Sequence, residues 1–290
     1  AEALGNVICG LYYLESYCTQ LASGRVSGTV QPVVTKPRAG AVKSDARFGF
    51  AQPAFAAGLA DAVAAARDNG VATFAVANAH TCTSLGFFTE QIAAQGVIAI
   101  GMTNASPVVA PPGGNTAVIG TNPIAMTVPG TGAPRMHFDF STSAVALGKI
   151  TMAKAAGQAI PLGWAVDADG QPTADPDAAL KGALVSAGGY KGWGFGLMVE
   201  LLAAGMTGSV NSLDVKGLKL PEGAPHGLGQ FYILMDPTTY GDDFSARFAR
   251  VAQAVAAQDG ARIPGADRRV RDVVDVPDAL WALVDTLAAA

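Results

Sequence analysis

Two hydrophobic patterns alternate between residues 50 and 140. Apolar residues at helical spacing predict helices, and short apolar runs bounded by turn residues predict buried strands. The alanine-rich helix stops at Gly70, a residue type that commonly ends helices. The predicted elements are a helix over 53–70, a strand over 71–77, a helix over 85–96 and strands over 97–102, 123–130 and 136–140. This alternation is typical of an α/β protein.

The remaining segments continue the pattern to the C-terminus. Residues 1–21 are helix-like, and a further helix is predicted from about Thr142, with Ser141 or Thr142 as its N-cap. The polar stretch over 165–182 predicts a surface hairpin with an Asp-Gly turn, followed by a short helix. The last predicted elements are a buried helix over 197–206, a strand over 229–236 and two amphipathic helices, the second over 277–290. No repeat or linker separates these elements, so a second domain would be interleaved with the first.

The composition fits a globular protein and excludes some classes of partner. The chain has 290 residues, of which 50% are hydrophobic, and a formal net charge of −4. No cluster of Lys and Arg matches a nucleic acid or an anionic membrane surface, so neither is expected as a partner. Residues 91–134 carry no charge, but Gly, Pro and Asn interrupt them and leave no apolar run long enough for a membrane span.

The few cysteines and histidines limit the redox and metal chemistry. Cys9, Cys18 and Cys82 lack CxxC spacing, which argues against a disulfide framework or a structural zinc site and favours a reducing, cytoplasmic compartment. With 3 histidines in the chain, a histidine-rich metal site is not expected. The usual motifs of Rossmann, P-loop, zincin and serine-hydrolase sites are absent from the sequence.

Glycines and turn residues gather at the predicted strand ends. The segment GGYKGWGFG over 188–196 precedes a predicted helix, in which each glycine would cost about 1 kcal/mol relative to alanine. Close approach of a ligand would explain these glycines, with Lys191 as a cation for phosphate or carboxylate; a solvated lysine in a glycine loop is the alternative. The turns at 113–115 and 120–122 expose N–H groups that suit anions, or contain Gly and Asn because positive φ is required.

Two other segments place polar side chains at strand ends. In residues 139–149 a carboxylate ends a strand and three hydroxyls follow, an arrangement that suits a phosphate or ribose and equally suits an N-cap. His80 follows a predicted buried strand, where a polar side chain can point into a crevice. A lone histidine in this position is also typical of a hydrogen-bonded structural residue.

Together these segments resemble one family in their order along the chain and in their amino-acid sequences. The chain is similar to the non-Rossmann malate/L-lactate dehydrogenase family, which also contains Δ1-piperideine-2-carboxylate reductases and ureidoglycolate, sulfolactate and diketogulonate oxidoreductases. The resemblance covers nearly the whole chain through NAHTCTSLG, GTNPIAMTVPG, DFSTSAVALGKI, AVDADGQPTADP, GGYKGWGFGLMVELL, GLGQFYILMDP and RIPGADRR. Each segment alone is weak, but the series is too long to arise by chance.

The resemblance implies both the fold and a cofactor. The expected fold is α/β, of the non-Rossmann malate/L-lactate dehydrogenase type with interleaved domains. Residues 1–70 and 240–290 would form a mainly helical domain, and residues 71–239 an NAD(P)-binding domain. NADH or NADPH would lie between the domains, usually in a homodimer. Relative to the family, the N-terminus is expected to lack several tens of residues.

The family's binding residues carry over to this chain position by position. The substrate would contact Thr121, Leu147 and Gly148. The glycines of 188–196 would let the backbone and Lys191 approach the dinucleotide at a helix N-terminus, which favours negative charge. NAD and NADP are not distinguished, because the arginines of 262–269 suit either a pyrophosphate or a 2′-phosphate. The expected cofactor contacts are Thr81, Cys82, Thr83, Ser84, Leu85, Asp139, Phe140, Ser141, Tyr190, Lys191, Arg262, Pro264, Gly265 and Arg268.

The catalytic segment departs from the family pattern. Members usually carry Ser-His-Gly followed three residues later by Arg, with the histidine as proton donor and the arginine on the substrate carboxylate. Here Ile8, Cys9 and Tyr13 stand at the serine, histidine and arginine positions. Lys149 occupies a position that is aspartate in imine-reducing members and lysine in malate-type members. The chain therefore lacks the bidentate clamp that an arginine provides.

Several side chains remain as candidate proton donors. They are His80, Lys149, Cys9 and Tyr12 or Tyr13. We favour His80, with Lys149 as the electrostatic partner of the reacting oxygen or nitrogen. Cys9 is equally consistent with a small, buried apolar side chain.

The predicted function is an NAD(P)H-dependent oxidoreductase that acts on a small oxo, hydroxy or imino compound, with or without the usual α-carboxylate. The alternative is a dinucleotide-binding protein that has lost or changed its catalytic activity. A small-molecule substrate and a homodimer are expected, and no metal.

Overall fold

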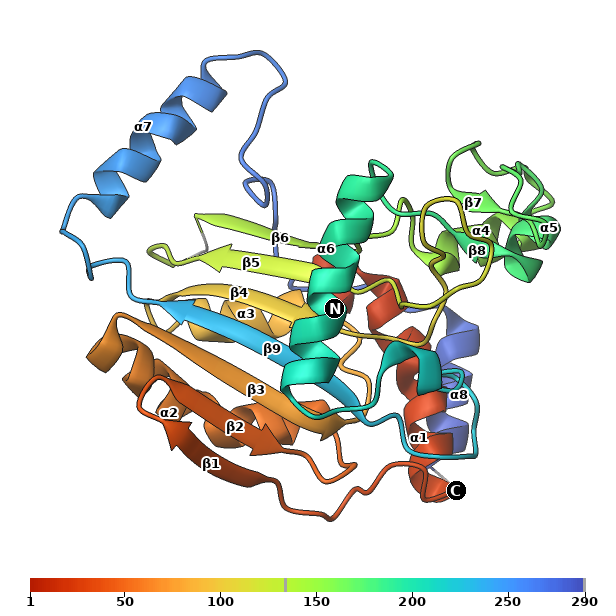
Figure 1. Ribbon diagram of the computed structural model, residues 1–290, viewed down its shortest axis with the longest axis horizontal. Helices are drawn as coiled ribbons and strands as arrows, with labels where there is room; N and C mark the ends of the chain where they lie inside the picture. The colour runs from red at the N-terminus through yellow and green to blue at the C-terminus, as the bar shows by residue number, and fades with distance from the viewer. Residues whose placement is uncertain (133–134, 289–290) are drawn as a thin grey trace.

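A mixed sheet of seven strands runs through the molecule (Figure 1). The computed structural model describes residues 1–132 and 135–288. The strand order is β1-β2-β3-β9-β4-β5-β6. Among these strands β2 and β3 pair in parallel, and the other neighbours are antiparallel. The strands are β1 (Val33–Arg38), β2 (Ala41–Asp45), β3 (Val71–Ala79), β4 (Ile98–Thr103), β5 (Ile124–Val128), β6 (Met136–Phe140) and β9 (Leu228–Met235).

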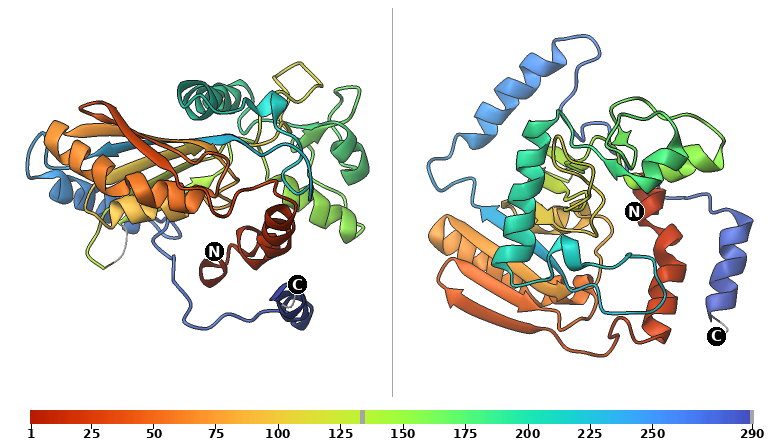
Figure 2. Two further views of the ribbon diagram at one scale, coloured as in Figure 1. Left: turned by 90° about the horizontal axis from the view of Figure 1, so that it is seen from below. Right: turned by 45° about the vertical axis from the view of Figure 1, so that its right-hand side comes forward.

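Helices pack against both faces of this sheet. α2 (Ala51–Asn69) and α3 (Gly86–Ala93) lie on one face, and α6 (Tyr190–Glu200), which continues as a π-helical turn (Leu201–Met206), lies on the other (Figure 2). The main core, between α2, α3 and the sheet, contains Phe55, Phe74, Phe88 and Tyr232. Because the central strands have helices on both sides, β3, β4 and β9 have the continuous apolar runs from which they were predicted.

Gly229 in β9 lets the π-helical turn lie directly on the sheet. A Cβ at this position would overlap the carbonyl oxygen of Ala203 and lie 2.6 Å from Oγ1 of Thr207. The Gly229 N–H donates to Oδ1 of Asn104 (2.9 Å), and its carbonyl oxygen accepts from Oγ1 of Thr103 (2.8 Å). The backbone of the helix therefore packs on the backbone of the strand, which requires glycine.

A smaller unit lies beside the sheet. Its apolar centre includes Ile150 and Leu184. The predicted hairpin and short helix are confirmed: the N–H of Asp167 donates to the carbonyl oxygen of Gln171 (2.9 Å), and Asp175 caps the helix. The elements of this unit are α4 (Leu147–Ala155), β7 (Ala165–Val166), α5 (Pro176–Lys181) and β8 (Ala183–Leu184).

The two ends of the chain form helices that lie side by side. α1 (Leu14–Ala22) packs along α8 (Asp278–Ala288), and α7 (Phe244–Ala256) projects from the opposite side of the molecule (Figures 1 and 2). Three 3-10 turns precede α1 and replace part of the helix expected over 1–21. The two C-terminal helices are confirmed, although residues 289–290 of the second lie outside the described residues. Between residues 1 and 288, leaving out 133–134, no helix is long and apolar enough to cross a bilayer.

The helix predicted from about Thr142 begins later, at Leu147. The hydroxyl of Thr142 donates to the carbonyl oxygen of Thr121 (3.1 Å) instead of capping a helix. Ala146 takes the N-cap position, so the caps predicted at Ser141 and Thr142 are wrong.

The helix predicted over 197–206 begins earlier, at Tyr190. Part of the glycine segment therefore lies inside α6. This helix is also not buried on all sides, because Leu197, Leu201 and Met206 are exposed to solvent.

Strands β1 and β2 were not predicted from the sequence. Their sequences, VVTKPR and AVKSD, mix apolar residues with charged residues and a proline, so neither shows a clear hydrophobic periodicity. They belong to the same sheet as β3, so residues 1–70 supply strands as well as helices. The division into residues 1–70 plus 240–290 and residues 71–239 stays a prediction.

Candidate functional site

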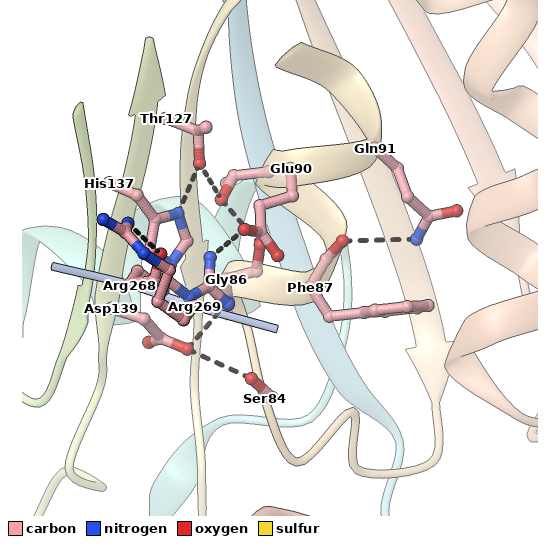
Figure 3. A network of polar contacts seen from close by, with 11 residues as sticks. Ser84, Gly86, Phe87, Glu90, Gln91, Thr127, His137, Asp139, Arg268 and Arg269 are labelled. Atoms are coloured by element: carbon pink, nitrogen blue, oxygen red, sulfur yellow. Dashed lines mark hydrogen bonds and ion pairs between the residues drawn. The ribbon is translucent and has the colours of Figure 1, made fainter. Parts of the chain in front are cut away.

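A cavity of about 450 Å³ opens between β6, the start of α3 and the loop over residues 262–268. Its walls include Ser84, His137, Asp139, Arg262 and Arg268, and the first residues of the chain lie along another side. Figure 3 shows the polar contacts that join these elements. A cavity of this size, with a few convergent polar groups, is typical of a small-molecule site.

Asp139 follows the buried part of β6 and holds the start of α3 (Figure 3). Its Oδ2 accepts hydrogen bonds from the N–H of Gly86 (2.7 Å) and from the hydroxyl of Ser84 (3.5 Å). A Cβ on Gly86 would lie 2.8 Å from Nε2 of His137, so only glycine fits at this position. Burial raises the pKa of the Asp139 carboxyl group, and the hydrogen bond from Gly86 opposes this. The cavity wall thus combines a carboxylate with a helix N-terminus.

The loop over 262–268 is fastened to β6 and to α3. The carbonyl oxygen of Pro264 accepts from the N–H of His137 (2.9 Å). Gly265 has a φ of 82°, and a Cβ there would lie 2.7 Å from the carbonyl oxygen of His137. Arg268 forms an ion pair with Glu90 of α3 (Figure 3). These contacts fix the position of the loop and of its arginines beside the cavity.

The N-terminal segment places Cys9 against the loop between β3 and α3, although neither Cys9 nor Tyr13 lines the cavity. Sγ of Cys9 donates to the carbonyl oxygen of Thr83 (3.6 Å). Ile8 reaches α4, where its Cδ1 lies 3.6 Å from the place of a Cβ on Gly148. Burial raises the pKa of the Cys9 thiol, and it raises the pKa of Tyr13 to about 12. Both groups therefore keep their protons at neutral pH.

His80 lies in a buried cluster of rings. Its side chain is 2% exposed, and its Nε2 lies 2.6 Å from Oε1 of Gln20. The ring stacks on His226 at a centroid distance of 4.2 Å, and Tyr17 packs against it edge-on at 4.9 Å. Burial lowers the pKa of His80 to about 4 and that of His226 to about 3. Both imidazoles are therefore neutral at pH 7.

We expect the free energy of unfolding to decrease as the pH falls below about 6.5. In the folded protein the pKa values of His80 and His226 are about 4 and about 3, whereas in the unfolded chain both are about 6.5. Between these values the unfolded chain binds more protons, so the stability is greatest above pH 6.5 and is lost on acidification. The free energy of unfolding measured in urea should be lower at pH 5 than at pH 7 by about 2 kcal/mol or more. The same pH dependence in His80→Gln would contradict this origin.

Comparison with known proteins identifies the family. Residues 1–277 match the family model for malate/L-lactate dehydrogenase. The chain belongs to the malate/L-lactate dehydrogenase family. It is 38% identical over 294 residues to a (2R)-3-sulfolactate dehydrogenase (NADP(+)) of Chromohalobacter salexigens, with 100% of this chain and 87% of the relative covered. It is 40% identical over 265 residues to a Delta(1)-pyrroline-2-carboxylate/Delta(1)-piperideine-2-carboxylate reductase of Pseudomonas putida, with 91% and 77% covered.

Solved structures of the malate/L-lactate dehydrogenase family share the fold. The delta1-piperideine-2-carboxylate reductase of Pseudomonas syringae superposes with a TM-score of 0.91 at 35% identity, over 99% of this chain and 89% of that one. The predicted resemblance and the α/β fold class are therefore confirmed. This member of the malate/L-lactate dehydrogenase family is an oxidoreductase.

Part of the predicted cofactor site lies together in the structure. The predicted residues Thr81, Cys82, Thr83 and Leu85 connect β3 to α3, while Phe140 and Ser141 follow Asp139. His137 and Phe87 also line the cavity but were not predicted as site residues. The histidine within the strand sequence MHFDF was a signal that could have indicated His137. The predicted residues that line the cavity are Ser84, Asp139, Arg262, Pro264, Gly265 and Arg268.

Tyr190 and Lys191 lie apart from that cavity among the residues that the structure describes, and both are exposed at the start of α6. A Cβ on Gly196 would lie 2.7 Å from Cδ1 of Ile119, so part of the glycine segment serves packing within the protein. Gly189 lines a second cavity, of about 250 Å³, together with the turn over 113–114. Contact between this segment and a dinucleotide stays a prediction.

The predicted substrate residues belong to the smaller unit or its border. Leu147 and Lys149 are exposed in the first turn of α4, and Gly148 lies beside Ile8. The carbonyl oxygen of Thr121 accepts from the N–H of Thr142 (2.9 Å). Their roles toward a substrate stay predictions.

A buried polar network next to Thr121 was not predicted. The carboxylate of Glu200 accepts from Nδ2 of Asn122 (2.9 Å) and from the N–H of Ser212 (2.7 Å), and also from the Ser212 hydroxyl. A glutamate in a helix predicted to be buried was a signal for such partners, since buried carboxylates are rarely unpaired. In the part of the chain that the structure describes, no group of three or more His, Cys, Asp and Glu side chains is arranged to hold a metal ion.

Proposed function

We propose that this chain is an NAD(P)H-dependent oxidoreductase that transfers hydride to or from a small 2-oxo, 2-hydroxy or 2-imino acid. The observation that carries this proposal is the cavity of about 450 Å³ that combines Asp139, the start of α3 and two arginines. The names of the relatives, which refer to sulfolactate and to cyclic imino acids, support the substrate class.

The residues of the cavity suit the polar parts of a dinucleotide. Arg262 is paired with Asp267 and Arg268 with Glu90, so these guanidinium groups offer their remaining N–H donors. The start of α3 adds its helix dipole, and the free oxygen of Asp139 can accept a hydrogen bond from a ribose hydroxyl. The name of the sulfolactate dehydrogenase includes NADP(+), which makes NADPH the first cofactor to test. When bound, the nicotinamide supplies or accepts the hydride. The chain must then position the substrate and supply a proton.

We assign the proton donor to Tyr13. Its phenol keeps its proton at neutral pH, because burial raises its pKa to about 12. It belongs to the N-terminal segment, whose Ile8 packs against Gly148 of α4. His80 was the donor favoured from the sequence, but its ring is enclosed by Tyr17 and His226, which favours a structural role. Lys149, exposed in the first turn of α4, would stabilise the charge that develops on the reacting oxygen or nitrogen.

Fluorescence titration with NADPH and NADH, followed by turnover assays with 2-oxo acids and cyclic imino acids, tests the proposal. We expect one nucleotide to bind and its oxidation to depend on one of these substrates. Arg268→Ala should weaken binding of that nucleotide, whereas Arg38→Ala, in β1 and outside the cavity walls, is a matched control. Binding without turnover would favour the alternative of a dinucleotide-binding protein with lost or changed catalysis. Failure of both nucleotides to bind would reject both functions.

We also propose that the protein is a cytoplasmic homodimer. Cys9, Cys18 and Cys82 are free thiols, which supports a reducing compartment. Leu197 and Leu201 lie exposed on α6 and its π-helical turn, which supports contact with a second copy. Sedimentation analysis should give twice the mass of the chain, and Leu201→Lys should shift the protein toward the monomer.

A further inference from the structure

The loop over residues 216–224 is held firmly against the N-terminal helix. The side chain of Gln20 donates to the carbonyl oxygens of Leu218 (2.8 Å) and Leu220 (2.7 Å). Arg25 donates to the carbonyl oxygens of Gly217 (3.0 Å) and Ala224 (3.0 Å). Both Gln20 and Arg25 are buried. The backbone of this loop therefore has a fixed position relative to α1.

This fixed loop places Lys219 over two tyrosine rings. Its Nζ lies 3.7 Å from the ring centroid of Tyr12 and 5.1 Å from that of Tyr13. The side chain is exposed, and within residues 1–132 and 135–288 no carboxylate lies at ion-pair distance from its ammonium group. The rings orient the ammonium through cation–π attraction without neutralising it. Lys219 thus presents an uncompensated positive charge at the edge of the catalytic segment.

The position of this charge bears on the missing carboxylate-binding arginine. Tyr13 stands where the family pattern has the arginine that holds the substrate carboxylate. The substrate class proposed above carries an acidic group, and a cation close to Tyr13 would take the place of that arginine. Lys219 lies on the face of this same ring.

We propose that Lys219 is the residue that binds the acidic group of the substrate, with Tyr12 and Tyr13 as the platform that positions its ammonium group. This inference rests on the function proposed above. An ammonium group is a compact charge with no fixed fork, unlike a guanidinium group. The site therefore selects for a negative charge on the substrate rather than for the planar geometry of a carboxylate.

The test compares Lys219→Met, Lys219→Arg and a control, Lys216→Met, which removes an exposed lysine from the same loop. The substrates are Δ1-pyrroline-2-carboxylate and Δ1-pyrroline, which lacks the carboxylate. For the carboxylate substrate, Lys219→Met should raise KM about tenfold or more. It should leave NADPH binding unchanged and affect the reduction of Δ1-pyrroline far less than that of the carboxylate substrate. Lys219→Arg should restore most of the affinity, and the control should match the natural protein.

Calorimetric binding of pyrrole-2-carboxylate, a non-reducible analogue, separates this inference from the proposed function. Binding by the natural protein that is lost in Lys219→Met supports the role of Lys219, even where no turnover occurs. Equal binding by the two proteins, an unchanged KM, or no binding of the analogue by the natural protein would overturn it. The circular dichroism spectrum of Lys219→Met should match that of the natural protein, because the side chain is exposed.

Discussion

Replacing Gly229 with alanine should destabilise the protein severely. The added Cβ would overlap the carbonyl oxygen of Ala203, which belongs to the helix backbone and cannot rotate away as a side chain could. Either the π-helical turn must lift from β9 or the strand must shift, and both lose buried contacts of Val199 and Phe231. We expect the free energy of unfolding in urea to fall by about 3 kcal/mol or more.

Gly194→Ala is the matched control for this substitution. Gly194 lies in α6, where an added Cβ would meet no atom within 4 Å. This variant should be as stable as the natural protein or more stable by up to about 1 kcal/mol, because alanine favours the helix. If Gly229→Ala unfolded at the same urea concentration as Gly194→Ala, the close contact between the helix and β9 would be refuted.

Replacing Tyr13 with phenylalanine should have the largest effect on catalysis. Phenylalanine keeps the ring and its packing against Tyr17 but removes the hydroxyl group that we assign as proton donor. We expect kcat to fall about a hundredfold or more, in line with the usual contribution of a general acid. The KM for an acidic substrate should change little, because the ring beneath Lys219 remains.

Tyr12→Phe provides the comparison for this loss of activity. Tyr12 is the adjacent tyrosine, with an exposed side chain and the same contact to Lys219. Steady-state kinetics with the same substrate should give a kcat near that of the natural protein. An unchanged kcat in Tyr13→Phe would exclude its hydroxyl and direct attention to Cys9 or Lys149 as the proton donor.

The sequence predicted the central strands and the helices packed on them because their patterns are local. β3, β4 and β9 have continuous apolar runs, and α2 ends at a glycine with positive φ, so each element carries its own signal. The start of α4 was missed because Thr142 bonds to Thr121, 21 residues earlier in the chain. No local pattern reports a partner at that separation.

The candidate site likewise depends on contacts that no local sequence pattern reports. The local pattern singled out Asp139 as a carboxylate at a strand end, but Arg268 was identified only through the resemblance to a family, since its relation to the site depends on distant segments. The ion pair between Arg268 and Glu90 joins residues 178 positions apart. The contact of Lys219 with Tyr12 and Tyr13 likewise depends on how the loop over 216–224 folds back on α1. Such contacts became visible only in the folded chain.

The loop over 262–268 also affects how this protein behaves toward copies of itself. β6 is the last strand of the sheet, and its outer backbone groups would otherwise be open to pairing with a strand of another molecule. The carbonyl oxygen of Pro264 occupies the N–H of His137 on that side. At the opposite end, β1 carries Lys36, Pro37 and Arg38, which discourage such pairing. The segment with the proposed cofactor residues therefore also covers part of the edge of β6, and we expect variants that loosen it to lose solubility together with cofactor affinity.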